Sequence, residues 1–138
     1  IGRVYYLDGQ FEQSLKMLKT ARNMITDDAD CSLYLGQTYM EMGRYDEAST
    51  VLRGVVEKHS GYTRAYYVLG QSLGKQGNLA DAHYYLGIYH TRKRDLKKAI
   101  VQYRQALKYT KDAERRATIE KRLKKFEELL AKQRKRQY

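Results

Sequence analysis

A 34-residue period runs through the first two thirds of the sequence. Three sets of residues keep this spacing: Gly2, Gly36 and Gly70; Gly9, Gly43 and Gly77; and Tyr5, Tyr39 and Leu73. Apolar residues repeat at helical intervals inside each period, which is typical of stacked helix–turn–helix units. A stack of this kind usually binds another polypeptide on its curved surface and carries out no chemistry of its own.

Composition favours helices and limits the available chemistry. The 138 residues contain no proline, and the dominant Leu, Ala, Gln, Glu, Lys and Arg side chains lose little rotamer freedom in a helix. The single cysteine, Cys31, excludes an intramolecular disulfide and a cysteine-based zinc site. No apolar run is long enough to span a bilayer. Because the sequence begins within an expected helix, we expect it to be a piece of a longer protein.

Hydrophobic spacing and turn residues predict a series of short helices joined by tight turns. We expect helices over Gly2–Leu7, Phe11–Ile25, a segment with Leu35, Tyr39 and Met42 that ends at Gly43, Tyr45–Lys58, Tyr62–Gln76, Leu79–Arg92, a segment from Asp95 through Leu107, and one from near Asp112 past Leu130. Asp27, Asp28 and Asn78 are suited to cap helix N-termini by accepting free backbone N–H groups.

The order of these residues resembles the tetratricopeptide repeat family. One repeat supplies Tyr34-Leu35-Gly36, Tyr39, Gly43, Tyr45, Ala48 and Leu52, and the next supplies Tyr66, Leu69-Gly70, Leu73, Gly77, Leu79, Ala82 and Leu86. The resemblance implies an all-α fold, a right-handed solenoid of antiparallel helix pairs over residues 1–110. Residues 111–138 are expected to form a long basic capping helix, with an apolar stripe made of Ile119, Leu123, Phe126 and Leu130.

The sequence departs from the family pattern in two ways. The proline that often ends each repeat is absent. The match also restarts half a repeat early, because Leu86-Gly87, His90, Leu96, Ala99, Tyr103 and Ala106 fit the motif as well. The helix over Leu79–Arg92 can therefore be the second helix of one pair or the first of the next.

A second resemblance concerns the C-terminal half. The runs Ala82–Gly87, Asp95–Ala99 and Glu120–Leu123 resemble the tail of BepA-type bacterial envelope zinc metalloproteases, in which an HExxH domain precedes a tetratricopeptide tail. This resemblance implies a partner- or substrate-handling module in the bacterial envelope or periplasm. The segment itself has no HExxH, so we expect no catalysis here. A free-standing assembly scaffold is the alternative.

No residue pattern predicts a catalytic, metal or cofactor site. His83 and His90 are seven residues apart, or roughly 10 Å along a helix, which is too far to share one metal ion. His59 lies near a helix end, where an imidazole can interact with free carbonyl groups. We therefore expect structural roles for all three histidines, and neither a cofactor nor a small-molecule substrate.

The first helices of the pairs predict a peptide-binding groove. Gln37, Gln71 and Gln105 occupy the same place in successive periods, and glutamine both donates and accepts hydrogen bonds. A column of glutamines suits the backbone of an extended peptide, although glutamine is also a common exposed helix former. The neighbouring groove positions are Leu33, Met40, Glu41, Arg64, Tyr67 and Lys75. We expect a protein or extended peptide as the partner.

Positive charge is concentrated in the C-terminal third. Residues 1–91 contain nine Lys or Arg and ten Asp or Glu, a net −1, whereas residues 92–138 contain eighteen and six, a net +12. A basic patch is expected from Arg92, Lys93, Arg94, Arg134, Lys135 and Arg136. These residues could bind an acidic protein, an anionic membrane surface or phosphates. Acidic residues interrupt the last helix, so a solvated helix is favoured over a nucleic-acid reader.

Overall fold

The computed structural model describes residues 11–24 and 28–137, and this part of the chain is helical with no strand. Its helices are α2 (Phe11–Met24), α3 (Ala29–Glu41), α4 (Tyr45–Lys58), α5 (Thr63–Lys75), α6 (Leu79–Arg92), α7 (Leu96–Tyr109) and α8 (Ala113–Gln137). The helix expected over Gly2–Leu7, the turn at Gly9 and the candidate cap Asp27 lie outside the described residues.

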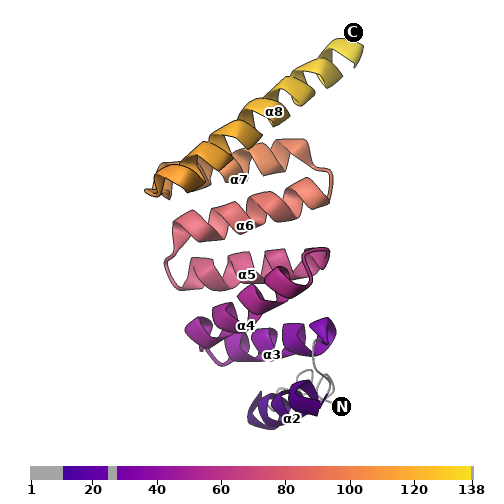
Figure 1. Ribbon diagram of the computed structural model, residues 1–138, viewed down its shortest axis with the longest axis vertical. Coiled ribbons are helices and arrows are strands. Elements are labelled where there is room, and N and C mark those ends of the chain that lie inside the picture. The colour runs from indigo at the N-terminus through magenta and orange to yellow at the C-terminus, as the bar shows by residue number, and fades with distance from the viewer. Residues whose placement is uncertain (1–10, 25–27, 138) are drawn as a thin grey trace.

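The helices stack in chain order along the long axis of the molecule (Figure 1). Each helix packs on the next one, and α3 also contacts α5. Helices α4, α6 and α8 begin at Tyr45, Leu79 and Ala113, so their starts keep the period of the sequence repeat. The all-α solenoid predicted from the repeat is therefore confirmed.

Local side chains fix where the helices begin. Asp28 accepts a hydrogen bond from the backbone N–H of Cys31 at 3.1 Å. The same type of cap is formed by Asp95, which accepts from the backbone N–H of Lys98 at 3.1 Å. Each bond satisfies one of the backbone donors that a first helical turn leaves without a partner. Asp28 is thereby confirmed as a cap.

The turns after α3, α5 and α6 share one geometry. The second residue after each helix has a positive φ, namely 75° at Gly43, 83° at Gly77 and 61° at Arg94. In each turn the next residue's N–H donates to a carbonyl five residues earlier, as Asp95 does to His90 at 2.9 Å. Glycine adopts this backbone conformation without steric cost, whereas arginine does not.

Among the described residues, three helix crossings are close enough to require glycine. A Cβ atom at Gly36 would lie 2.7 Å from the Leu52 side chain, and one at Gly70 would lie 2.7 Å from Leu86. At Gly87 the nearest atom, on the ring of Tyr103, would be 2.8 Å away. The partner follows its glycine by sixteen residues in every case.

These crossings decide the role of α6. Towards α5 it is the second helix of a pair, because Leu86 fills the space beside Gly70. Towards α7 it is the first helix of a pair, because its own Gly87 receives Tyr103. The two alternatives that the sequence left open are thus both realised in one helix.

Within the described part of the chain, the buried residues form two core clusters. The first extends from Leu15 and Leu18 of α2 to Ala82 of α6. The second lies between α7 and α8, with Tyr84 and Ile88 of α6 packed against it. Its α8 residues are Ile119, Leu123, Phe126 and, partly buried, Leu130. The predicted apolar stripe of α8 therefore does cover the end of the stack.

Candidate peptide-binding surface

One side of α5 presents a continuous exposed stripe. Arg64, Tyr67, Gln71 and Lys75 are spaced by three, four and four residues, so they share one side of the helix, and all four are exposed. The tyrosine keeps 40% of its surface open. The opposite side of α5 is buried in the first core through residues such as Leu69. The stripe is thus available to a partner.

Helix α3 contributes a second set of side chains beside this stripe. Glu41 is exposed, whereas Gln37 and Met40 are half-buried. The Oε1 atom of Gln37 is shielded from solvent and has no hydrogen-bond partner within the described part of the chain. A shielded carbonyl oxygen without a donor is unfavourable, so a rotation of the Gln37 side chain that exposes its amide to a donor would be favoured.

Two further predicted groove residues are placed differently. Leu33 is 1% exposed and belongs to the first core, so its assignment to the groove is wrong. Gln105 is exposed on α7, and α6 lies between α5 and α7 (Figure 1). Because α3 and α5 contact each other directly but α5 and α7 make no comparable contact, we group Gln71 with Gln37 and not with Gln105.

Two tyrosine hydroxyls join α5 to its surroundings, one of them to α3. The hydroxyl of Tyr62, at the start of α5, donates to Asp30 in the first turn of α3. Burial, and then this hydrogen bond, raise the pKa of Tyr62 to about 12. The Tyr66 hydroxyl donates to the carbonyl of Ser60 at 2.9 Å. The Tyr62 bond joins the start of α5 to the start of α3, and the Tyr66 bond joins α5 to the turn that precedes it.

Tyr89 belongs to the surface, although the sequence did not indicate it. Its ring lies 5.1 Å from that of Tyr67, measured between centroids, and it is only half-buried. In the frame of the repeat Tyr89 corresponds to Val55, which is a core residue at 3% exposure. The repeat therefore predicts a buried position for Tyr89, and no other sequence signal indicates that it lies at the surface.

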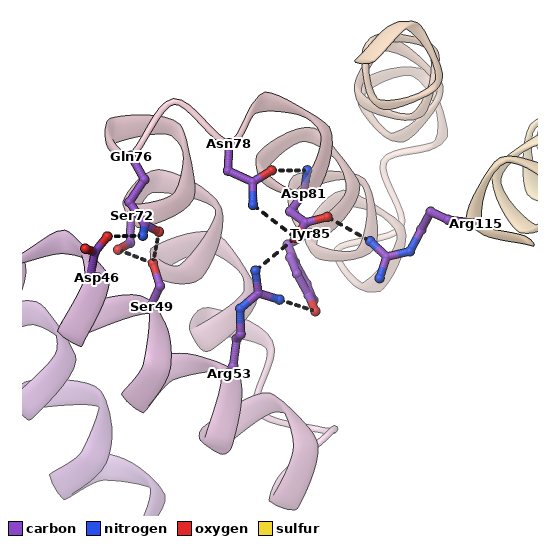
Figure 2. A network of polar contacts seen from close by, with 9 residues as sticks. All are labelled: Asp46, Ser49, Arg53, Ser72, Gln76, Asn78, Asp81, Tyr85 and Arg115. Carbon is purple, nitrogen blue, oxygen red and sulfur yellow. Dashed lines mark hydrogen bonds and ion pairs between the residues drawn. The ribbon is translucent and has the colours of Figure 1, made fainter. Parts of the chain in front are cut away.

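A polar network connects α4, α6 and α8 (Figure 2). Asp81 accepts hydrogen bonds from Arg53 at 2.9 Å and from Arg115 at 3.1 Å. It also accepts one from Asn78 at 3.2 Å. Burial opposes the charge of Asp81, but the bond from Arg53 and the charges of both arginines outweigh it and lower the pKa of the carboxyl. A carboxylate held by two cations is a structural anchor and is unsuited to act as a general base.

A second group of polar contacts in Figure 2 joins α4 to α5. The hydroxyls of Ser49 and Ser72 lie 2.8 Å apart, and both are buried. Ser72 also donates to the carbonyl of Tyr45 at 3.1 Å. Because these buried groups satisfy one another, they support the packing and leave no reactive hydroxyl.

The predicted basic patch is divided between two elements. Arg92 is partly engaged, since it donates to the Thr63 hydroxyl at 3.1 Å and lies over the ring of Tyr66. Lys93 and Arg94 are exposed in the turn after α6. The other members, Arg134, Lys135 and Arg136, are exposed on the end of α8 that projects from the stack (Figure 1).

Neither a metal centre nor a membrane span is found in residues 11–24 and 28–137. No three His, Cys, Asp or Glu residues in these ranges are arranged to hold a metal ion, and no helix there is both long and apolar enough to cross a bilayer. His83 pairs with Gln102 at 2.7 Å and stacks on Tyr109. Burial lowers the pKa of His90.

Comparisons with known proteins agree with this architecture. Two profiles, both described as Tetratricopeptide repeat, match residues 5–71 and 80–113. The second match pairs α6 with α7, as the crossing at Gly87 does. No curated protein matches the chain significantly.

Several solved structures share the fold at low sequence identity. The type III secretion translocator chaperone SycD of Yersinia enterocolitica is 19% identical with a TM-score of 0.59, over 96% of this chain and 81% of SycD. A crystal structure of MamA is 22% identical with a TM-score of 0.56, over 100% of this chain and 98% of its own. A MamA fragment (41-end) from Desulfovibrio magneticus RS-1 is 21% identical with a TM-score of 0.56, over 96% and 88%. With its repeat spacing, glycine crossings and profile matches, the chain belongs to the tetratricopeptide repeat family.

Proposed function

We propose that this chain is a non-catalytic protein-binding module that holds an extended peptide along the exposed sides of α3 and α5. The observation that carries the proposal is the stripe of Arg64, Tyr67, Gln71 and Lys75 on α5, next to the half-buried Gln37 of α3. Membership of a repeat family whose stacked helices form binding surfaces supports it. The solved chaperone SycD shares the fold.

Each part of this surface suits a different part of a peptide. The half-open ring of Tyr67, backed by Tyr89, offers apolar area with a polar end. Gln71 can both donate to and accept from a peptide backbone. Rotation of the half-buried Gln37 side chain would bring its oxygen, shielded and without a donor in the described part of the chain, within reach of a peptide N–H. Together they favour recognition of an extended main chain with one apolar side chain.

A displayed peptide library tests the proposal. We would select binders from peptides about ten residues long, which span about 33 Å when extended. Affinities would then be measured on Tyr67→Ala, Gln71→Ala and a control, Tyr109→Ala. Tyr109 is matched to Tyr67 in exposure, 39% against 40%, but lies on α7.

The selected peptides should bind Tyr67→Ala about tenfold more weakly, because the apolar contact is removed. Gln71→Ala should weaken binding by a smaller factor, and the control should bind as the wild type does. Unchanged affinity of the selected peptides for both Tyr67→Ala and Gln71→Ala would contradict the proposal.

The larger context of the module stays a prediction from the sequence. Three contexts are compatible with the sequence. The module is part of an envelope zinc metalloprotease, it is a free-standing assembly scaffold, or it binds an anionic surface through residues 92–138. The first requires a metalloprotease domain in the same protein, which the full gene sequence would reveal.

A further inference from the structure

We propose a second docking surface, at the C-terminal end of the stack, that takes an acidic amphipathic helix from a partner protein. The surface is an open groove of about 370 Å³ between α7 and the C-terminal half of α8. It is distinct from the candidate peptide-binding surface on α3 and α5. Six of its residues define it: Lys97, Val101 and Arg104 on α7, and Leu130, Ala131 and Arg134 on α8.

The groove has the form of a seat for one more helix. On each of the two helices four lining residues are spaced by three, one and three residues along the sequence. Each helix therefore presents one straight stripe of side chains to the groove. Its floor is apolar and open, since Val101 is 53% exposed and Leu130 is only partly buried. A helix of about 14 residues, or about 21 Å, would match the length of α7.

The rim of the groove determines the charge of the partner. Lys97, Arg104 and Arg134 line it, and the one carboxylate, Glu127, is paired with Arg104 at 3.4 Å. The groove lies within residues 92–138, which carry a net +12. Leucines would cover the apolar floor while acidic side chains on the flanks of the same helix approach the rim cations.

The same charges argue against other occupants. A second copy that used its own α8 would bring two strongly positive segments together, and residues 1–91 are nearly neutral at −1. A nucleic acid would satisfy the cations but would leave Val101 and Leu130 uncovered, because a phosphate backbone offers them no apolar surface. Of these three occupants, an acidic amphipathic helix is the one that satisfies both the floor and the rim.

A synthetic peptide tests this inference on the full chain. The probe is a labelled helix of about 14 residues, with leucine at every third or fourth position and glutamate on the flanks. Its affinity would be measured by fluorescence anisotropy at about 50 and 300 mM salt, where the screening length differs more than twofold. A scrambled peptide of the same composition controls for charge alone, and an unrelated DNA duplex tests the nucleic-acid alternative.

Two groove variants and one matched control complete the experiment. Val101→Glu places a negative charge in the exposed floor, and the double variant Lys97→Glu/Arg134→Glu reverses the rim. The control, Lys108→Glu, changes an exposed α7 residue outside the groove. All these positions are exposed, and circular dichroism confirms that each variant is folded.

We expect the helical probe to bind at low salt and to bind about tenfold more weakly at high salt. Both groove variants should reduce affinity at least tenfold, and the control by less than threefold. Failure of the probe to bind, equal binding of the scrambled peptide, unchanged binding by Val101→Glu, or tighter binding of DNA through the same residues would overturn the inference. So would a dimer in sedimentation that Val101→Glu dissolves. Tyr67→Ala separates the two proposals, since it should leave this affinity unchanged.

Discussion

The first and second cores use the same helix crossing but fill it with different chemistry. In the first core Gly36 and Gly70 each receive a leucine, whereas in the second Gly87 receives the ring of Tyr103. The interval of sixteen residues is the same in all three. The comparison shows that the repeat fixes the position of the contact and leaves the identity of the filling side chain free.

The tyrosines of and around the second core are contacted by arginine side chains. Arg122 donates to the hydroxyl of Tyr103 at 3.2 Å. Arg115 lies over the ring of Tyr84, with its guanidinium carbon 4.1 Å from the ring centroid. A count of positive charges in the C-terminal third therefore overstates what is free for a partner, because part of it stabilises the fold.

The largest expected effect comes from filling a crossing. Gly70→Leu should lower the free energy of unfolding by about 3 kcal/mol, since even a Cβ would lie 2.7 Å from Leu86 and 3.3 Å from the carbonyl of Ala82. Urea denaturation measures the change. The control is Gly54→Ala, within α4, where a Cβ meets nothing within 4 Å and helix propensity should raise stability. If both variants unfold at the same urea concentration, the crossing at Gly70 is not close-packed.

Replacing the tyrosine at the Gly87 crossing with leucine, as found at the other two crossings, should lower the free energy of unfolding somewhat less. Tyr103→Leu removes a ring that is 1% exposed and the acceptor of the Arg122 hydrogen bond, and we expect a loss of about 2 kcal/mol. The variant Tyr103→Phe keeps the ring and should lose only about 1 kcal/mol. Calorimetry on both variants separates the ring from the hydroxyl. Equal stability of Tyr103→Leu and wild type would mean that leucine and tyrosine are interchangeable at this contact.

Loss of the Asp81 carboxylate, which pairs with Arg53 and Arg115, should have the next largest effect. Because the pKa of Asp81 is lowered in the folded state, its stabilisation is present above the ordinary aspartate pKa and is lost as the pH falls through the lower folded value. Asp81→Asn should cost about 1 kcal/mol at neutral pH, and the difference from wild type should shrink below about pH 4. Unfolding curves across this range test it, with the exposed Glu57→Gln as control. A difference that is constant with pH would exclude the ion pairs as its cause.

The smallest effect concerns the turn between the two regions, and it is stabilising. Arg94 has φ 61°, where the corresponding turns have Gly43 and Gly77. Arg94→Gly should raise the free energy of unfolding by about 0.5 to 1 kcal/mol by relieving this conformation. The neighbouring Lys93→Gly, at φ −81°, should give no gain. A melting temperature that falls in Arg94→Gly would show that its side chain contributes more than its backbone costs.

Local sequence signals were sufficient to predict most of the fold. The helices Tyr45–Lys58 and Leu79–Arg92 have the predicted bounds, because the turn glycines before them, Gly43 and Gly77, and the Asn78 cap of α6 act within a few residues. The apolar stripe of α8 was predictable for the same reason, since it depends only on helical spacing. Sequence alone also showed that α6 fits two positions in the repeat.

Features that depend on packing between distant helices were not predictable. Asp81 meets Arg53 and Arg115, which lie far from it along the chain on other helices, and no local pattern joins them. Leu33 is one turn before Gln37 and was assigned to the same surface, but the start of α3 is covered by the first core. The candidate surface was thus predicted in part, and its limits required the structure.

The double use of α6 has a consequence for how such molecules change in length. Because α6 presents a leucine to its predecessor and a glycine to its successor, the stack can be extended at this point by a single helix with its turn. Insertion beside α6 of one more helix with the same leucine and glycine would preserve the crossings on either side of it and shift the helices beyond that point by half a repeat. A duplication of half a repeat could therefore give a related protein a different binding face without the need to evolve a new fold.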